Sequence, residues 1–335
     1  MFFNLYKNLK YFSPGFKYEK KQPILSKPKK YFRQIKLELS EIDETKFLKK
    51  NFGNKNKKKN FLIINRSSYN TGFFSNCCYV INSLIIAEKN KMIPVVDMEN
   101  FPNLYNEKHK IDNSYNSWNY YFENVSKYTL KDAYQSKNVY FTSGIFHKDL
   151  EINPGSNKFI KPLKKFIKIK KNILDEIDSF HKKNFKQKKI LGVLFRGQEQ
   201  RFSPNHYLPP TIDQIINLID KIMKKKKFDK IFLCTEEQSY LDLLKKNYGN
   251  KIIFYNSQRS YDINRYYYYN RKNHRYKLGK EILIESILLS KCSEIIGTRT
   301  NVTETARLFS FINNKKIKIT YIKNGINFNN AFLRR

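Results

Sequence analysis

Short apolar runs alternate with longer stretches of helical spacing along most of the chain. The first run, FLIIN at 61–65, is followed by a polar loop that contains glycine and by CCYVINSLIIAEKN, in which apolar residues recur at helical spacing. The next apolar run, MIPVVDM, covers 92–98. This order predicts a strand, a helix and a second strand, which together form a parallel β-α-β unit.

The same alternation returns in the second half of the chain, after a lysine-rich helical segment at 158–189. There the pattern predicts strands at 190–195, 230–235, 251–255 and 293–298, and helices at 211–224, 237–247, 280–292 and 301–311. Strands that alternate with helices over two halves predict an α/β fold of two doubly wound, Rossmann-like domains facing across a cleft. In such folds, ligands bind outside the carboxyl ends of the strands.

These patterns and the lysine-rich segments divide the chain into four expected parts. They are a basic N-terminal segment at 1–58, a first α/β domain at 59–185, a second α/β domain at 186–312 and a C-terminal tail at 313–335. Hydrophobic residues make up 40% of the sequence, which is enough for a sizeable core and argues against global disorder.

Basic residues outnumber acidic ones by a wide margin. The 335 residues include 65 Lys and Arg against 29 Asp and Glu, which gives a formal net charge of +36. This excess favours nucleic acid, an anionic membrane surface or a phosphorylated ligand as a partner. The alternative to a charged partner is a general bias of the sequence toward Lys, Asn, Ile and Tyr, in which case most lysines are ordinary solvated surface residues.

Several function classes lack their sequence signatures. The four cysteines show no spacing typical of zinc sites, and the sequence contains no P-loop, no G-x-G-x-x-G and no D-x-D with two aspartates. We therefore expect no metal and no cofactor. No apolar run reaches transmembrane length, which predicts a cytoplasmic protein, either free or peripheral at the inner face of the membrane.

The strand predicted at 190–195 ends in a charged turn, within ILGVLFRGQEQR. A guanidinium at the carboxyl end of a strand can hold two phosphate oxygens at once, so Arg196 is a candidate for binding a diphosphate. Gly197 allows a sharp turn and a close approach of a ligand to the backbone. Glu199 could take a proton from a substrate or hold Arg196 in place. An ordinary ion pair at the strand end is the alternative interpretation of Arg196.

A second candidate for anion binding lies in the segment GTRTNVTETARLFS. Asn301 and Glu304 have the spacing of an N-cap and the third helical residue of a capping box, so we expect a helix to begin there. Thr298, Arg299 and Thr300 supply hydroxyl groups and a cation directly before the positive end of that helix. The alternative is a well-capped helix with a structural role only.

Three further residues could take part in binding or in proton transfer. Glu236 follows the strand IFLCT and could accept hydrogen bonds from a ribose or a base, although exposed acids also open helices in this way. Glu285 lies among apolar residues of the predicted helix 280–292, so it needs an arginine or a ligand hydroxyl as a partner. His206, in SPNHYLPP, is either a proton acceptor or an ordinary loop histidine.

The order of these segments resembles that of a known enzyme family. VLFRGQE, KIFLCTEEQSYLDLLKKNYGNKIIFYN and GKEILIESILLSKCSEIIGTRTNVTETARLFS are similar to the donor domain of α1,6- and nodulation-type fucosyltransferases. GFFSNCCYVINSLIIAEKNKMIPVVDM is similar to the first half of their bacterial relatives. The resemblance covers roughly residues 61–312. It implies a GT-B-like fold, with an acceptor-side domain at 59–185 and a nucleotide-sugar donor domain at 186–312.

The resemblance also assigns roles to residues of the donor domain. Arg196 matches the arginine that binds the GDP pyrophosphate in the family motif H-x-R-R-x-D. Leu194, Gly197 and Glu199 stand where that motif has histidine, its second arginine and aspartate. Glu236 matches the first acid of a T-D-D segment associated with the guanosine.

The remaining donor-side and proton-transfer assignments follow from the same comparison. Glu285 matches a helix aspartate that supports the donor site, and Thr300 and Asn301 match residues that receive the β-phosphate. The catalytic acid of the family has no clear counterpart, so Glu199 and His206 are the candidates for it.

On the acceptor side, Asn76 and Trp118 would line the site. The indole of Trp118 could stack on a sugar or belong to the core.

The resemblance implies an inverting, metal-independent glycosyltransferase for polysaccharide biosynthesis. It would move a sugar, with fucose as the first candidate, from a GDP-sugar to a glycan or lipid-linked glycan. Two alternatives stay open. A nucleic-acid-binding protein would use the positive charge and the aromatic segment RYYYYNRKNHRY for phosphate contacts and stacking. A relative that binds sugar nucleotides without catalysis is suggested by Leu194 and Gly197.

Overall fold

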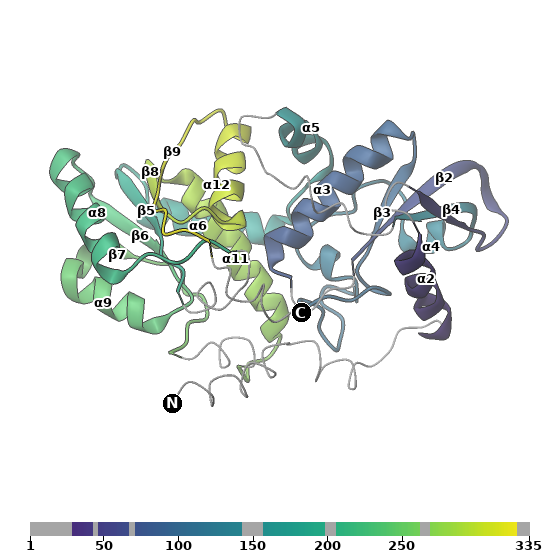
Figure 1. Cartoon of the computed structure of the whole chain (residues 1–335), viewed down its shortest axis with the longest axis horizontal. Helices are drawn as coiled ribbons and strands as arrows, with labels where there is room; N and C mark the ends of the chain where they lie inside the picture. The colour runs from purple at the N-terminus through teal and green to yellow at the C-terminus, as the bar shows by residue number, and fades with distance from the viewer. Residues whose placement is uncertain are drawn as a thin grey trace. The chain divides into compact units, whose positions relative to one another are not determined.

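The computed structural model describes residues 29–42, 46–66, 71–142, 157–197, 206–261 and 269–326. The chain divides into two compact units, and Figure 1 labels most of their helices and strands. Unit 1 contains Met1–Glu151 and Lys161–Lys170, and unit 2 contains Ile152–Ile160 and Lys171–Arg335. Each unit has its own sheet and its own apolar core.

Unit 1 is built on a mixed four-stranded sheet with the order β1-β4-β2-β3. β2 (Lys55–Asn65) pairs in parallel with β3 (Ile93–Asp97) and with β4 (Ser136–Thr142). β1 (Phe47–Lys50) pairs antiparallel with β4 at the edge. α3 (Phe73–Lys89) connects β2 to β3, so the predicted β-α-β unit is confirmed.

The fold of unit 1 begins earlier than the sequence pattern indicated. α2 (Lys29–Glu41) buries Phe32, Ile35 and Leu39, which are spaced so that they share one face of the helix. These side chains form one apolar cluster with residues of β2, β3 and β4. The described part of 29–58 is therefore helix and strand packed into unit 1, and the expectation of a separate basic segment is wrong for it.

The connection from β3 to β4 carries the short helices η1 (Ser117–Tyr120) and α4 (Leu130–Ala133). Asn116 ties this connection to the sheet. Its side-chain amide donates to the carbonyl of Val96 (2.7 Å) and accepts from the backbone N–H groups of Met98 (3.1 Å) and Trp118 (3.2 Å). A buried amide that uses both its groups in this way holds a long connection in a fixed conformation. After β4, α5 runs through Asn157–Phe166.

Unit 2 is built on a parallel five-stranded sheet with the order β7-β6-β5-β8-β9. Its strands are β5 (Ile190–Leu194), β6 (Lys230–Cys234), β7 (Ile252–Ile253), β8 (Glu294–Gly297) and β9 (Lys318–Tyr321). The chain order reverses between β5 and β8. This reversal is the topological switch point at which doubly wound sheets bind ligands.

Helices cover both faces of this sheet. On one face, Leu191, Val193 and Phe195 share an apolar cluster with residues of α8 (Ile212–Lys225) and α9 (Gln238–Tyr248). The α/β fold with doubly wound, Rossmann-like topology is thus confirmed, most fully in unit 2.

On the other face, Gly192 leaves room for α11 (His274–Lys291), because a Cβ at this position would lie 3.0 Å from Leu289 Cδ2. α6 (Lys171–Asn184) and α12 (Asn301–Ile312) pack against α11. The short η2 (Gly249–Lys251) leads into β7.

The bounds of unit 2 differ from those expected. α6 belongs to it, so the division falls after Lys170 and not at 185. β9 lies in the expected tail at 313–335, where its partly exposed side chains gave only a weak apolar signal. α11 begins at His274, earlier than the helix expected at 280–292. None of the described helices is both long and apolar enough to cross a membrane.

Candidate functional site

The carboxyl ends of β5 and its neighbours bring predicted site residues to one edge of the unit 2 sheet. In the register of this sheet, Leu194 lies beside Cys234 of β6 and Gly297 of β8. Arg196 and Glu236 each follow two residues later, so they leave adjacent strands at the same edge.

Arg196 and Glu236 form an ion pair there. Nε of Arg196 lies 3.0 Å from Oε2 of Glu236, and the two side chains are 22% and 5% exposed. The other carboxylate oxygen of Glu236 accepts a hydrogen bond from the backbone N–H of Gly197 (3.1 Å). The ion pair that was the alternative interpretation of Arg196 is therefore present, and it fixes the guanidinium at the end of β5.

Gly197 is required by close packing at this turn. A Cβ at this position would lie 1.6 Å from Oε1 of Glu237 and 2.8 Å from Cε2 of Tyr240. Tyr240 in turn stacks on Phe195, with ring centroids 3.7 Å apart and planes inclined by 8°. The turn after β5 is thus held between a buried acid and an aromatic stack.

Glu285 lies on α11 and has the arginine partner that its apolar surroundings demanded. Ser257 donates its hydroxyl to Oε1 of Glu285 (2.6 Å), and Nη2 of Arg259 lies 3.4 Å from the same oxygen. Burial nevertheless raises the pKa of Glu285 to about 7, because the loss of hydration outweighs the help from Arg259 and Ser257. This carboxyl group therefore titrates near neutral pH.

One turn earlier on α11, Glu281 holds the loop that follows β7. Arg271 donates to both carboxylate oxygens of Glu281, at 2.7 and 2.8 Å, and the backbone N–H of Gln258 donates to one of them (3.0 Å). Sequence analysis did not single out Ser257, Gln258 or Arg271. The sequence contained one indication of these residues, namely that a charged loop directly follows the end of the strand predicted at 251–255.

The helix expected after β8 is present, with a different cap. Thr300 is the N-cap of α12, and it forms a capping box with Thr303. The predicted pairing of Asn301 with Glu304 is therefore wrong by one position, because Asn301 is already the first helical residue. Glu304 instead accepts a hydrogen bond from the hydroxyl of Tyr321 (2.6 Å).

The other residues of this segment are not equally available to a ligand. Thr298 is fully buried, and its carbonyl accepts a hydrogen bond from the hydroxyl of Thr303 (3.1 Å). Nε of Arg299 lies 3.5 Å from Oε1 of Glu304, so this cation already has an acidic neighbour.

A small hollow joins the strand ends to the start of α12. Its walls include Arg196, Glu236, Glu281, Glu285 and Val302, where Val302 belongs to the first turn of α12. The guanidinium and the helix start therefore meet at one hollow at the switch point. Thr298, Arg299, Thr300 and Asn301 are close in sequence to its wall but do not line it among the described residues.

Of the two candidates for proton transfer, His206 does not line this hollow. His206 is exposed, next to Tyr207, which forms an isolated bridge with Ile326. Glu199 lies outside the described residues.

The two acceptor-side candidates lie together in unit 1. Asn76 and Trp118 are 4% and 3% exposed and line the same small apolar hollow. The indole of Trp118 packs on the ring of Phe122, with centroids 4.3 Å apart, and its N–H donates to the carbonyl of Glu123 (3.3 Å). Trp118 is thus packed as a core residue, which is the second of the two interpretations that the sequence left open.

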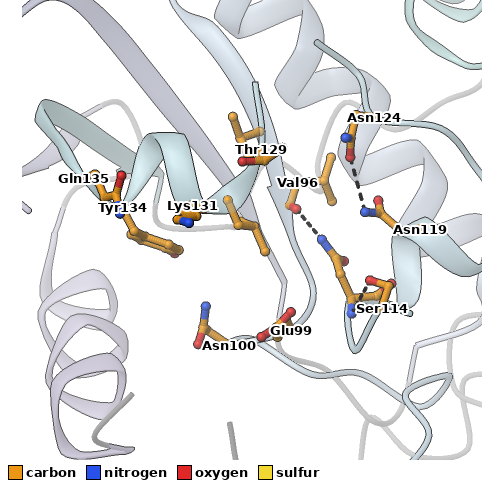
Figure 2. A pocket seen from close by; sticks show the side chains of 13 residues that line it. Val96, Glu99, Asn100, Ser114, Asn119, Asn124, Thr129, Lys131, Tyr134 and Gln135 are labelled. Carbon is orange, nitrogen blue, oxygen red and sulfur yellow. Dashed lines mark hydrogen bonds between the residues drawn. The ribbon is translucent and has the colours of Figure 1, made fainter. Parts of the chain in front are cut away.

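Unit 1 also has a larger pocket that sequence analysis missed. It has a volume of about 430 Å³ and lies beside β3, η1 and α4 (Figure 2). Four asparagines are among its lining residues, namely Asn100, Asn116, Asn119 and Asn124. Asparagine in loops is common in this sequence, so no pattern marked these four.

Among the described residues, no three His, Cys, Asp or Glu side chains are grouped so that they could hold a metal ion. All four cysteines are buried free thiols.

Comparison with known proteins shows what the fold resembles. No family model and no curated protein sequence matches this chain. Among solved structures, a NodZ α-1,6-fucosyltransferase co-crystallised with GDP superposes with a TM-score of 0.53 at 15% identity, over 80% of this chain and 96% of that one. The fold of this chain is therefore similar to that of the NodZ α-1,6-fucosyltransferase, and the resemblance inferred from the sequence is confirmed for the fold.

Two further solved structures are less similar. The NodZ fucosyltransferase from Bradyrhizobium has a TM-score of 0.48 at 16% identity, over 76% of this chain and 94% of that one. POFUT1 in complex with GDP has a TM-score of 0.39 at 9% identity, over 80% of this chain and 74% of that one.

Proposed function

We propose that this chain is a glycosyltransferase that moves a sugar, with fucose as the first candidate, from a GDP-sugar to a glycan acceptor. The observation that carries the proposal is the hollow at the switch point of unit 2, where Arg196 and the first turn of α12 meet. The fold supports it, since the NodZ structure of the same fold was co-crystallised with GDP. We further propose that the reaction inverts the anomeric centre and needs no metal or cofactor.

In this mechanism the acceptor hydroxyl attacks the anomeric carbon in a single displacement. The new carbon–oxygen bond forms as the bond to the diphosphate breaks, so negative charge grows on the departing oxygen. Arg196 stabilises that charge from a position fixed by Glu236. The backbone N–H groups at the start of α12 stabilise the same charge. The acceptor proton passes to a base, for which Glu199 and His206 remain the candidates.

The carboxylates of the hollow have a separate role in the proposal. Glu236 and Glu285 line the same walls as Arg196 and would accept hydrogen bonds from the nucleoside. The pKa of Glu285 is raised to about 7, so this group can donate as well as accept near neutral pH.

Nucleic-acid binding is the less favoured candidate. Of the segment RYYYYNRKNHRY, the described part holds Arg271 in a two-point ion pair with Glu281, and Arg275 is 9% exposed. Arginines held in this way do not offer their charge to a phosphate backbone. The positive charge of the chain instead supports a peripheral contact with an anionic membrane, where a lipid-linked acceptor is found.

A thermal-shift panel with GDP, UDP, CMP and dTDP tests the donor. A ligand that binds only the folded state raises the melting temperature by mass action, and we expect GDP to give the largest rise. Transfer from GDP-fucose to a glycan is then measured directly. GDP binding without turnover would identify an inactive relative, and a larger shift with another nucleotide would contradict the proposed donor.

A further inference from the structure

The pocket beside β3 in unit 1, here called the β3 pocket, has walls held by buried hydrogen bonds. Asp97, at the end of β3, is fully buried. Its carboxylate accepts from the backbone N–H groups of Glu99 (3.0 Å) and Asn100 (2.8 Å) and from the hydroxyl of Tyr134 (2.5 Å). The opposite wall is held by Asn116, whose side-chain amide donates a hydrogen bond to the carbonyl of Val96 in β3. These hydrogen bonds hold the backbone in place, so the side chains that face the pocket have fixed starting positions.

Several of those side chains keep hydrogen-bonding capacity. Asn100 donates to Asp97 (2.9 Å) and Asn119 donates to Asn124 (3.2 Å), each through its amide nitrogen. Among the described residues, no donor reaches the side-chain oxygens of Asn100, Asn119 or Glu99. Figure 2 shows Glu99 and Asn100 on one side of the pocket and Asn119 with Asn124 on another.

The unused groups suit one kind of ligand. The oxygens of Asn100, Asn119 and Glu99 are acceptors, and a sugar hydroxyl can donate to one of them while it accepts from another group. The pocket volume of about 430 Å³ falls within the range of small-molecule sites, which leaves room for a short saccharide.

The charges of the pocket favour a neutral ligand. Glu99 faces the pocket with buried Asp97 behind it, and although Lys110 offsets part of its charge, this wall does not attract an anion. Lys131 lines another wall and opposes a cation. The lining of the pocket holds one carboxylate and one lysine, so it lacks the positive excess of the chain as a whole, whose formal charge is +36.

We propose that the β3 pocket binds a neutral saccharide through Glu99, Asn100 and Asn119. This statement concerns unit 1 alone and does not depend on the transfer reaction. A second statement, that the saccharide is part of the acceptor glycan, rests on the proposed function.

The full-length protein is tested on a printed array of neutral, sialylated and free-amine glycans. We expect retention on neutral members, and at least a tenfold loss in the double variant Glu99→Ala/Asn119→Ala. Asn90→Ala is the matched control, because it removes an exposed amide of unit 1 that lies outside the pocket. GDP affinity is measured by calorimetry on the same samples, and all variants should bind GDP as the wild type does.

The outcomes separate the two proposals. Three results would overturn the saccharide site. They are no retention of the wild type, equal retention of the wild type and the double variant, or the strongest retention on sialylated glycans. A wild type that fails to bind GDP overturns the proposed function, while loss of glycan retention in the double variant would still support the pocket. If both hold, the acceptor role requires that the double variant raise the KM for the retained glycan and leave the KM for GDP-fucose unchanged.

Discussion

Arg196 and Glu236 pair at 3.0 Å across the carboxyl ends of the adjacent parallel strands β5 and β6, next to the switch point of the unit 2 sheet. The carboxylate of Glu236, which is 5% exposed, would be destabilising there without a partner, because burial costs an unpaired charge several kcal/mol of hydration. The pair therefore positions the guanidinium before any ligand arrives. A group that needs no rearrangement is the kind that stabilises charge developing in a transition state.

Arg196→Ala should reduce sugar transfer from GDP-fucose by about a hundredfold or more, since removal of one such donor costs roughly 3 kcal/mol. It should also lower the free energy of unfolding, because Glu236 is left without its partner. Sugar transfer is measured through the GDP that the reaction releases, and stability is measured by urea denaturation.

The double variant Arg196→Ala/Glu236→Gln separates these two effects. It removes the uncompensated charge, so stability should return toward that of the wild type while transfer stays low. A single variant that transfers sugar at the wild-type rate would contradict the role given to Arg196.

Gly197→Ala should be more damaging than its size suggests. The new methyl group would lie 1.6 Å from a carboxylate oxygen of Glu237, so the acid or the turn must move. Overpacking of this kind costs about 1–3 kcal/mol, and it would shift Arg196 as well. We expect a lower midpoint of urea denaturation and weaker GDP binding.

Gly72→Ala is the comparison for this variant. No atom lies within 4 Å of a Cβ placed on Gly72, and its φ of −63° suits any residue. It precedes α3 in unit 1, so a small loss of stability without loss of GDP binding is expected. Equal effects of the two variants would show that the contact with Glu237 is unimportant.

The features that could be predicted from the sequence are those that depend on local pattern. β5 is an uninterrupted apolar run, all of it buried. Its burial, and the position of Arg196 just after its end, could therefore be predicted from the run itself. The start of α12 was placed within one residue, because Thr300 and Asn301 are both good caps and the pattern does not choose between them.

The features that could not be predicted depend on contacts between distant residues. Arg259 meets Glu285, and Arg271 meets Glu281, only because the loop after β7 folds back on α11. The partner of Arg196 comes from the next strand and not from its own turn. Trp118 could be a ligand-stacking ring or a core ring by sequence, and only packing against Phe122 decides the question.

Thr300→Ala tests whether the start of α12 takes part in ligand binding. Thr211→Ala is its matched control, because Thr211 caps α8 in the same way, through a capping box with Gln214. Each variant should lose about 1 kcal/mol of stability. Only Thr300→Ala should also weaken GDP binding in calorimetry, since α12 begins at the hollow that contains Arg196. Equal GDP affinities of the two variants would remove α12 from the site.

Glu285 should make the stability of the protein fall as pH rises toward neutrality. Its pKa is about 7 in the folded chain and near the ordinary value of 4.5 in the unfolded chain, so the folded state binds the extra proton between these values. The stabilisation is complete below pH 4.5 and is lost as pH rises through 7. At about 1.4 kcal/mol for each pH unit, the loss amounts to about 3 kcal/mol.

Urea denaturation at intervals between pH 4.5 and 7.5 measures this loss, with Glu285→Gln as the variant that cannot titrate. The wild type should lose about 3 kcal/mol more than Glu285→Gln across that range, since one unit of pKa is about 1.4 kcal/mol. Glu88→Gln serves as control: the hydrogen bond from Lys165 lowers the pKa of Glu88, so any stabilisation by this group is lost mainly as pH falls below 4.5, and the variant should decline between pH 4.5 and 7.5 as the wild type does. If wild type and Glu285→Gln decline in parallel, burial does not hold the proton on Glu285, and the idea that this group donates to a nucleoside near neutral pH fails with it.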